Sequence, residues 1–98
     1  MSQSDALRIP DAAKKDAKSM ELLRVWVADH DQHVSLRVGV WEDPFAWGVV
    51  LADLAHHIAN TFHQHSKLDR AEVLARIEEG FDAEMAGPTE DSIGEVVE

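Results

Sequence analysis

The chain has 98 residues, 45% of them hydrophobic and 29% charged, and a formal net charge of −10. These values fit one modest globular domain and do not fit a disordered chain. The lack of cysteine excludes disulfides, thiolate zinc sites and cysteine nucleophiles. The N-terminus has no signal-peptide pattern, and the longest apolar stretch, residues 45–54, is too short to span a membrane. We therefore expect a cytoplasmic protein without a membrane partner.

The charge is unevenly distributed along the chain. Residues 1–20 carry four Lys or Arg against three acids, whereas residues 21–98 carry five against sixteen, a net of −11. Nucleic acids are polyanions that proteins bind chiefly through Lys and Arg. We therefore expect no nucleic-acid partner.

Residues 1–20 are predicted to form a flexible arm. Pro10 and Asp11 favour the start of a short helix that would extend to Met20, but its apolar stripe is thin. Residues 21–88 are expected to form a single α+β domain. Residues 89–98 contain four acids and no base, which is typical of a disordered acidic tail.

Residues 21–41 alternate between apolar and other side chains in two runs, separated by the polar segment 29–32. This pattern predicts a β-hairpin. Pairing Val27 with Val34 and Val25 with Leu36 places the small aliphatic side chains on one face. In that register Arg24 lies opposite Arg37 on the other face, and two opposed like charges are unfavourable. The two arginines therefore predict an acid from the arm or from the second helix, a bound anion, or a partner chain.

Two helices are expected after the hairpin. The first runs over about 44–63, with Asp43 as its N-cap and Pro44 in its first turn. The second runs over about 70–86, with Asp69 and Glu72 as a capping box and Gly87-Pro88 as its end. Apolar residues recur on one face of the first helix at three- and four-residue steps, which predicts packing on the aliphatic face of the hairpin. These residues are Trp47, Leu51, Leu54, Ala55, Ile58 and Phe62.

Three features of the sequence predict a homodimer. A two-stranded hairpin alone is marginal in water, its second face still carries tryptophans, and the long helix has a stripe of small residues suited to close approach. Twofold association is the most frequent way to cover such surfaces; the alternative is that the second helix fills the stripe and the arm covers a strand edge. The predicted interface residues are Trp26, Trp41, Gly48, Ala52, Ala55 and Ala59.

The six histidines do not form a metal-binding pattern. No two of them stand three or four residues apart on the predicted long helix, the spacing that lets two imidazoles share one ion. We find no nucleophile–base motif and no phosphate-binding glycine pattern. The sequence thus favours no metal, no cofactor and no catalytic residue. Asp53 and His57 remain the basis of an alternative, a small-ligand-binding or metal-assisted enzyme.

The sequence resembles a family of small bacterial proteins, the domain of unknown function DUF5076. The residues that carry the resemblance are Glu21-Leu22-Leu23-Arg24-Val25-Trp26-Val27, Val34-Ser35-Leu36-Arg37, Trp41-Glu42-Asp43-Pro44, Trp47-Gly48, Leu51, Asp53, Leu54, Ala55, His57, Ile58 and Ala59. The resemblance implies a standalone bacterial domain and carries over no activity, cofactor or site. The function that the sequence favours is a non-enzymatic interaction or regulatory module acting as a homo-oligomer.

Overall fold

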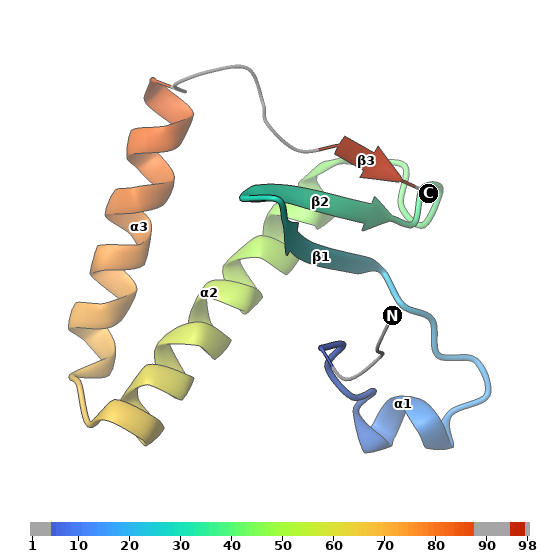
Figure 1. Cartoon of the computed structure of the whole chain (residues 1–98), viewed down its shortest axis with the longest axis horizontal. Helices are drawn as coiled ribbons and strands as arrows, with labels where there is room; N and C mark the ends of the chain where they lie inside the picture. Colours follow the sequence, from blue (N-terminus) through green and yellow to red (C-terminus); the bar gives the residue numbers. More distant parts are fainter. Residues whose placement is uncertain (1–4, 88–94, 98) are drawn as a thin grey trace.

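The computed structural model describes residues 5–87 and 95–97. It confirms an α+β fold in which a β-hairpin is followed by two long helices (Figure 1). The elements are α1 (Asp11–Lys15), β1 (Leu23–Ala28), β2 (Asp31–Leu36), α2 (Phe45–Ser66), α3 (Arg70–Ala86) and β3 (Glu95–Val97). The sheet has the strand order β1-β2-β3, with β1 and β2 antiparallel.

The hairpin turns on two residues, Asp29 and His30, whose φ angles are 53° and 69°. Positive φ at both positions is the geometry of a type I′ turn, which matches the twist of the strands that it joins. The turn places Val25 opposite Val34, Leu23 opposite Leu36 and Arg24 opposite Ser35. The predicted register, with Val27 opposite Val34, is therefore wrong by two residues. A shift of two preserves the face of every side chain, so the alternation of residues alone does not distinguish the two registers.

The second strand is shorter than the alternation of Val34, Leu36, Val38 and Val40 predicts. It ends at Leu36, and one more ladder bond follows, from the Arg37 amide to the Leu22 carbonyl at 2.9 Å. The chain then turns at Gly39, whose φ of 81° lies in the left-handed region that favours glycine. Trp41 consequently lies in the segment between β2 and α2 and not on the sheet.

Both ends of α2 are determined by local chemistry. Before the helix, the Asp43 carboxylate accepts a hydrogen bond from the Phe45 amide at 3.0 Å, but the N-cap residue is Pro44. The prediction of Asp43 as the N-cap and Pro44 in the first turn is therefore wrong by one residue. The helix continues to Ser66, three residues beyond the predicted end, and stops at Lys67, which has a φ of 60°.

The limits of α3 agree with the prediction. The Asp69 carboxylate accepts a hydrogen bond from the Glu72 amide at 3.0 Å, which is half of the predicted capping box. At the other end the Gly87 amide donates to the Ala83 carbonyl. The short loop of residues 67–69 connects α2 and α3 into an αα-hairpin.

Within the described residues, both ends of the chain differ from the prediction. The helix expected to reach Met20 ends at Lys15, and the next residue, Asp16, is extended and accepts a hydrogen bond from the Lys18 amide. In the segment predicted as a disordered tail, Glu95–Val97 form β3, which pairs parallel with β2 through Val34 opposite Val96. The remaining tail residues, 89–94 and 98, lie outside the described part of the chain.

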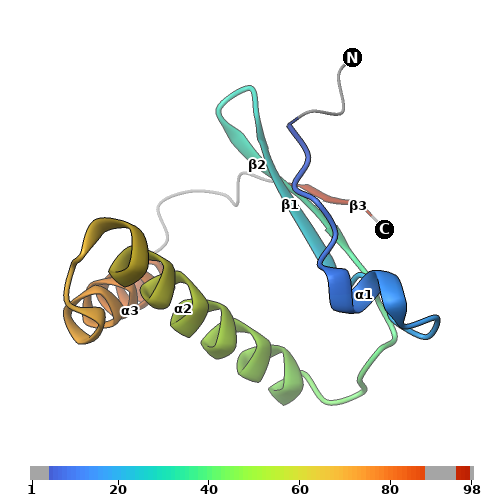
Figure 2. The ribbon, with the colours of Figure 1, turned by 90° about the horizontal axis from the view of Figure 1, so that it is seen from below.

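The long helices and the hairpin form two separate groups of contacts. Within the described residues, the contacting elements are β1 with β2, β2 with β3, and α2 with α3. The predicted packing of α2 on the aliphatic face of the hairpin is therefore not formed within one chain. Figure 2 shows α2 and α3 on one side and the hairpin with α1 on the other. None of these helices combines the length and the apolar character needed to cross a bilayer.

The turn residue His30 supplies a first test. Replacing His30 with glycine is expected to raise the free energy of unfolding, because a side chain at a left-handed position costs about 1 kcal/mol. Replacing it with valine is expected to lower the free energy of unfolding, because β-branched residues avoid positive φ. Urea denaturation of both variants against the parent protein measures the two changes. Changes of the same sign in both variants would contradict the type I′ turn.

Candidate functional site

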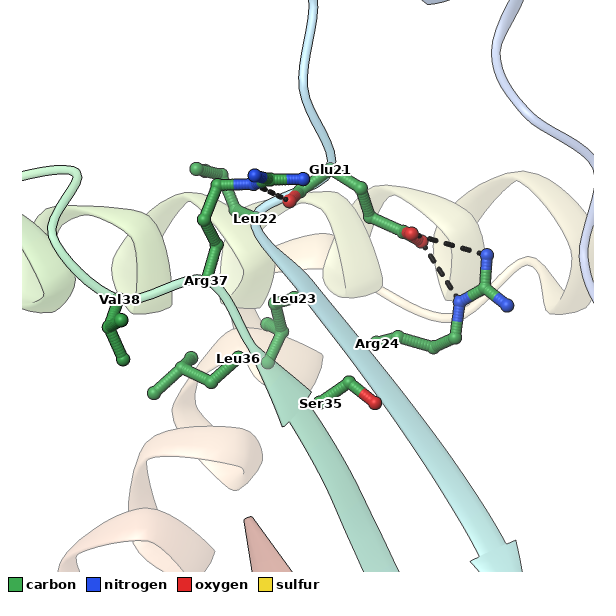
Figure 3. Close-up of a pocket in the computed structure, with 8 residues that line it drawn as sticks. All are labelled: Glu21, Leu22, Leu23, Arg24, Ser35, Leu36, Arg37 and Val38. Carbon is green, nitrogen blue, oxygen red and sulfur yellow. Dashed lines mark hydrogen bonds and ion pairs between the residues drawn. The ribbon is translucent and has the colours of Figure 1, made fainter. Parts of the chain in front are cut away.

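The clearest polar site is an open depression of about 540 Å³ at the end of the hairpin that lies farthest from its turn. Figure 3 shows the residues around it, which come from the start of β1 and the end of β2. These residues are Glu21, Leu22, Leu23, Arg24, Ser35, Leu36, Arg37 and Val38. The depression contains both arginines that the sequence analysis selected as a candidate anion site.

Glu21 connects the two arginines. Its carboxylate accepts two hydrogen bonds from Arg24, at 3.1 Å to Nε and 3.2 Å to the terminal nitrogen. Its backbone carbonyl accepts a hydrogen bond from Nε of Arg37 at 2.8 Å (Figure 3). The acidic partner of Arg24 is therefore Glu21, three positions before it in the sequence, and not an acid of the arm or of the second helix as predicted.

The direct opposition of Arg24 and Arg37 is a prediction that the structure contradicts. In the observed register Arg24 lies opposite Ser35, and Arg37 pairs with Leu22 just beyond the strands. The repulsion inferred from the wrong register is thus reduced by the longer separation and by the Glu21 carboxylate. Both members of the Glu21–Arg24 ion pair are about half exposed, and exposed pairs of this kind contribute about 0.2–1 kcal/mol.

A second polar cluster joins the two long helices. Arg70, at the start of α3, donates one hydrogen bond to Oδ1 of Asn60 and another to Nδ1 of His56, the latter at 2.9 Å. A guanidinium group has no acceptor, so His56 accepts through Nδ1. The cluster explains His56 as a structural residue that fixes α3 against α2. This contact was not predicted, because Arg70 is ten or more residues away from both partners in the sequence.

Asp53 and His57, the basis of the enzyme alternative, lie one turn apart on the exposed side of α2. The structure gives no hydrogen bond or ion pair between their side chains. Within the described residues, no three His, Asp or Glu side chains stand close enough together to hold a metal ion. No arrangement in this part of the chain thus points to chemistry at Asp53 or His57.

The stripe of small residues on α2 is divided along its length. Ala59 is fully buried and Ala55 is half-buried, because α3 packs against this end of α2. Gly48 and Ala52 are exposed, and a Cβ added at Gly48 would meet no atom within 4 Å. The second helix therefore fills the C-terminal half of the stripe, as in the intramolecular alternative, and leaves the N-terminal half open.

The two tryptophans predicted at the interface are partly exposed. Trp26 is 38% exposed on β1 and Trp41 is 39% exposed in the segment before α2. The Trp41 ring packs edge-on against Trp47, with ring centroids 5.4 Å apart. Trp41 thus contributes to the start of α2, and its role at an interface stays a prediction.

An uncovered apolar surface lies on α2 beside the small-residue stripe. Leu51, Leu54, Ile58 and Phe62 share one face of the helix and are 40–49% exposed. We call these four residues the helix patch. Further along α3, Phe81 is 50% and Met85 is 69% exposed. The sequence analysis identified the helix patch as an apolar face but assigned the hairpin of the same chain as its cover.

The exposed surface of the whole chain is large for its size. It measures 8550 Å², whereas a compact folded chain of 10.9 kDa exposes about 5,600 Å². The radius of gyration of 15.5 Å similarly exceeds the value of about 13 Å for a compact domain of this length. Ala59 is the one buried residue in the described part of the chain. A single chain thus leaves most of its apolar residues in contact with solvent.

The Glu21–Arg24 pair supplies a second test. Arg24→Ala is expected to lower the free energy of unfolding by less than about 1 kcal/mol, and Arg24→Glu by more, because the new carboxylate would face Glu21. The double variant Glu21→Arg with Arg24→Glu restores an ion pair at the same spacing and is expected to recover most of that loss. Thermal denaturation compares the three variants. A double variant no more stable than Arg24→Glu alone would show that the two side chains do not interact.

Comparison with known proteins identifies the family of the chain. The model of the domain of unknown function DUF5076 matches residues 6–89, and no functionally curated protein matches. A solved structure from the photosynthetic bacterium Rhodopseudomonas palustrus CGA009, named provisionally as a pyruvate dehydrogenase, is 32% identical to this chain. The similarity covers 87% of each chain, with a TM-score of 0.69. The chain therefore belongs to the DUF5076 family, whose function its name leaves open.

Proposed function

We propose that this protein is a non-enzymatic interaction module that acts as a homodimer. The observation that carries the proposal is the uncovered apolar surface: four residues of the helix patch are 40–49% exposed although they follow one another on a single helix face. A soluble monomer rarely exposes a contiguous apolar surface of this kind, and such a surface usually marks a contact with another protein. The homodimer is the simplest arrangement that covers it.

The surface area supports the same proposal. The chain exposes about 3,000 Å² more than a compact monomer of its mass. Stable interfaces bury about 1,200–2,000 Å² in total, and obligate dimers bury about 2,000–5,000 Å² or more. Two copies of this chain therefore have enough excess surface for an obligate dimer.

The provisional name of the relative from Rhodopseudomonas palustrus raises a second class of function, that of a dehydrogenase. A dehydrogenase needs groups that bind a cofactor and orient its reactive atom against the substrate. The polar depression on this chain instead holds two arginines whose nearest acid, Glu21, is already paired with one of them. No observation on the described residues favours a catalytic step, so the interaction module is the function that we propose.

Light scattering coupled to size exclusion tests the proposal directly. At micromolar concentration the protein is expected to elute with the mass of two chains of 10.9 kDa each. The variant Ile58→Glu adds a charge to the helix patch and is expected to give a single chain or an unfolded product, because a buried unpaired carboxylate is strongly unfavourable.

His57→Glu is the matched control, because it adds the same side chain one residue away on the exposed side of α2. This variant is expected to elute with the mass of two chains, like the parent protein. A parent protein that elutes with the mass of one chain would overturn the proposed homodimer. Equal effects of the two variants on the mass would show that the helix patch is not part of the interface.

A further inference from the structure

A second apolar surface lies on the hairpin. Val25 and Val27 project from one face of β1 and are 49% and 77% exposed. Across the sheet, their face is extended by Val34, which lies opposite Val25. We call Val25, Val27 and Val34 the sheet patch. Its side chains are aliphatic and branched at Cβ, which gives the flat surface on which a helix packs well.

The sheet patch and the helix patch do not cover each other within one chain. Hairpin and helices form separate groups of contacts in the described residues, and Figure 2 shows α2 apart from the strands. The segment between β2 and α2 is itself ordered by specific contacts. It contains the turn at Gly39, the edge-on packing of Trp41 on Trp47 and the hydrogen bond from the Phe45 amide to the Asp43 carboxylate.

We propose that the helix patch of one copy packs on the sheet patch of a second copy, and that the same contact is repeated in the opposite direction. This inference rests on the proposed homodimer and specifies how its two chains meet. In a twofold dimer, each contact that one chain makes with the other is repeated by symmetry in the opposite direction. Two unlike surfaces on one chain that do not contact each other are therefore both covered by a single type of contact.

The second copy is the occupant that the surfaces favour. The two patches together contain no charged residue, so they offer nothing to a charged ligand and match each other in character. The exposed area beyond that of a compact monomer, about 3,000 Å² per chain with the terminal residues included, exceeds the about 1,200–2,000 Å² in total that a stable interface buries. A contact between α2 and its symmetry mate would cover the helix patch but would leave the sheet patch in solvent.

Site-directed crosslinking distinguishes these arrangements, because the chain has no cysteine of its own. The single variants Val27→Cys and Ile58→Cys are prepared separately, mixed in urea, refolded together and treated with a short bismaleimide. The reciprocal contact is expected to give a crosslinked dimer in the mixture at several times the yield of either variant alone. The variant His57→Cys, mixed with Val27→Cys, is the control and is expected to give little product.

Each other outcome contradicts the inference at a different level. A crosslink that forms with Ile58→Cys alone would show that α2 packs on its symmetry mate. This result would support the homodimer and overturn the reciprocal contact. A homodimer in which no mixture gives a crosslink would also overturn the reciprocal contact. A crosslink formed inside a single chain carrying both substitutions, in protein with the mass of one chain, would overturn the inference and the homodimer together.

Discussion

The segment between β2 and α2 directs the long helix away from the hairpin, and the surface of the protein depends on this separation. In many small α+β domains a helix packs on the apolar face of a sheet and forms the core. Here the turn at Gly39 and the Trp41–Trp47 contact set a different path. The αα-hairpin buries one alanine, Ala59, and leaves apolar residues exposed on two surfaces, the helix patch and the sheet patch.

Polar contacts determine the local geometry around these surfaces without forming a catalytic arrangement. Glu21 organises both arginines at the end of the hairpin, and Arg70 fixes the start of α3 against His56 and Asn60 on α2. Each cluster stabilises one half of the chain, the sheet or the helix pair. Neither cluster joins the two halves, which is consistent with a module whose core is completed by another chain.

The sequence predicted those features that depend on neighbouring residues and missed those that depend on distant ones. The capping residue Asp69 and the end signal at Gly87 placed α3 within its observed limits, because capping acts over three or four residues. The alternation on β1 and β2 identified the hairpin and its faces. It gave the wrong register because a shift of two leaves every face unchanged. The register is decided by a two-residue turn with positive φ at Asp29 and His30. Asp is a usual residue at the first position of such a turn, but glycine is the usual residue at the second, where this chain has His30.

The candidate site followed the same rule. Arg24 and Arg37 line the same depression, although not as the directly opposed pair that the sequence predicted. Their acid partner Glu21 was recognisable in principle from its spacing of three residues before Arg24. The helix patch was visible as a periodic apolar face, but its cover was not, since the path of a connecting segment is a tertiary property. The small-residue stripe was recognised as a contact surface, and the structure assigns its end at Ala59 to α3.

In the proposed homodimer, one chain does not complete its own core and a second copy does. The most direct test is the midpoint of thermal unfolding as a function of protein concentration, because folding that is coupled to association makes the midpoint rise with concentration. The midpoint is expected to rise steadily over a hundredfold range of concentration. A midpoint that is independent of concentration, in protein with the mass of one chain, would show that the monomer is stable alone and that no second copy is needed.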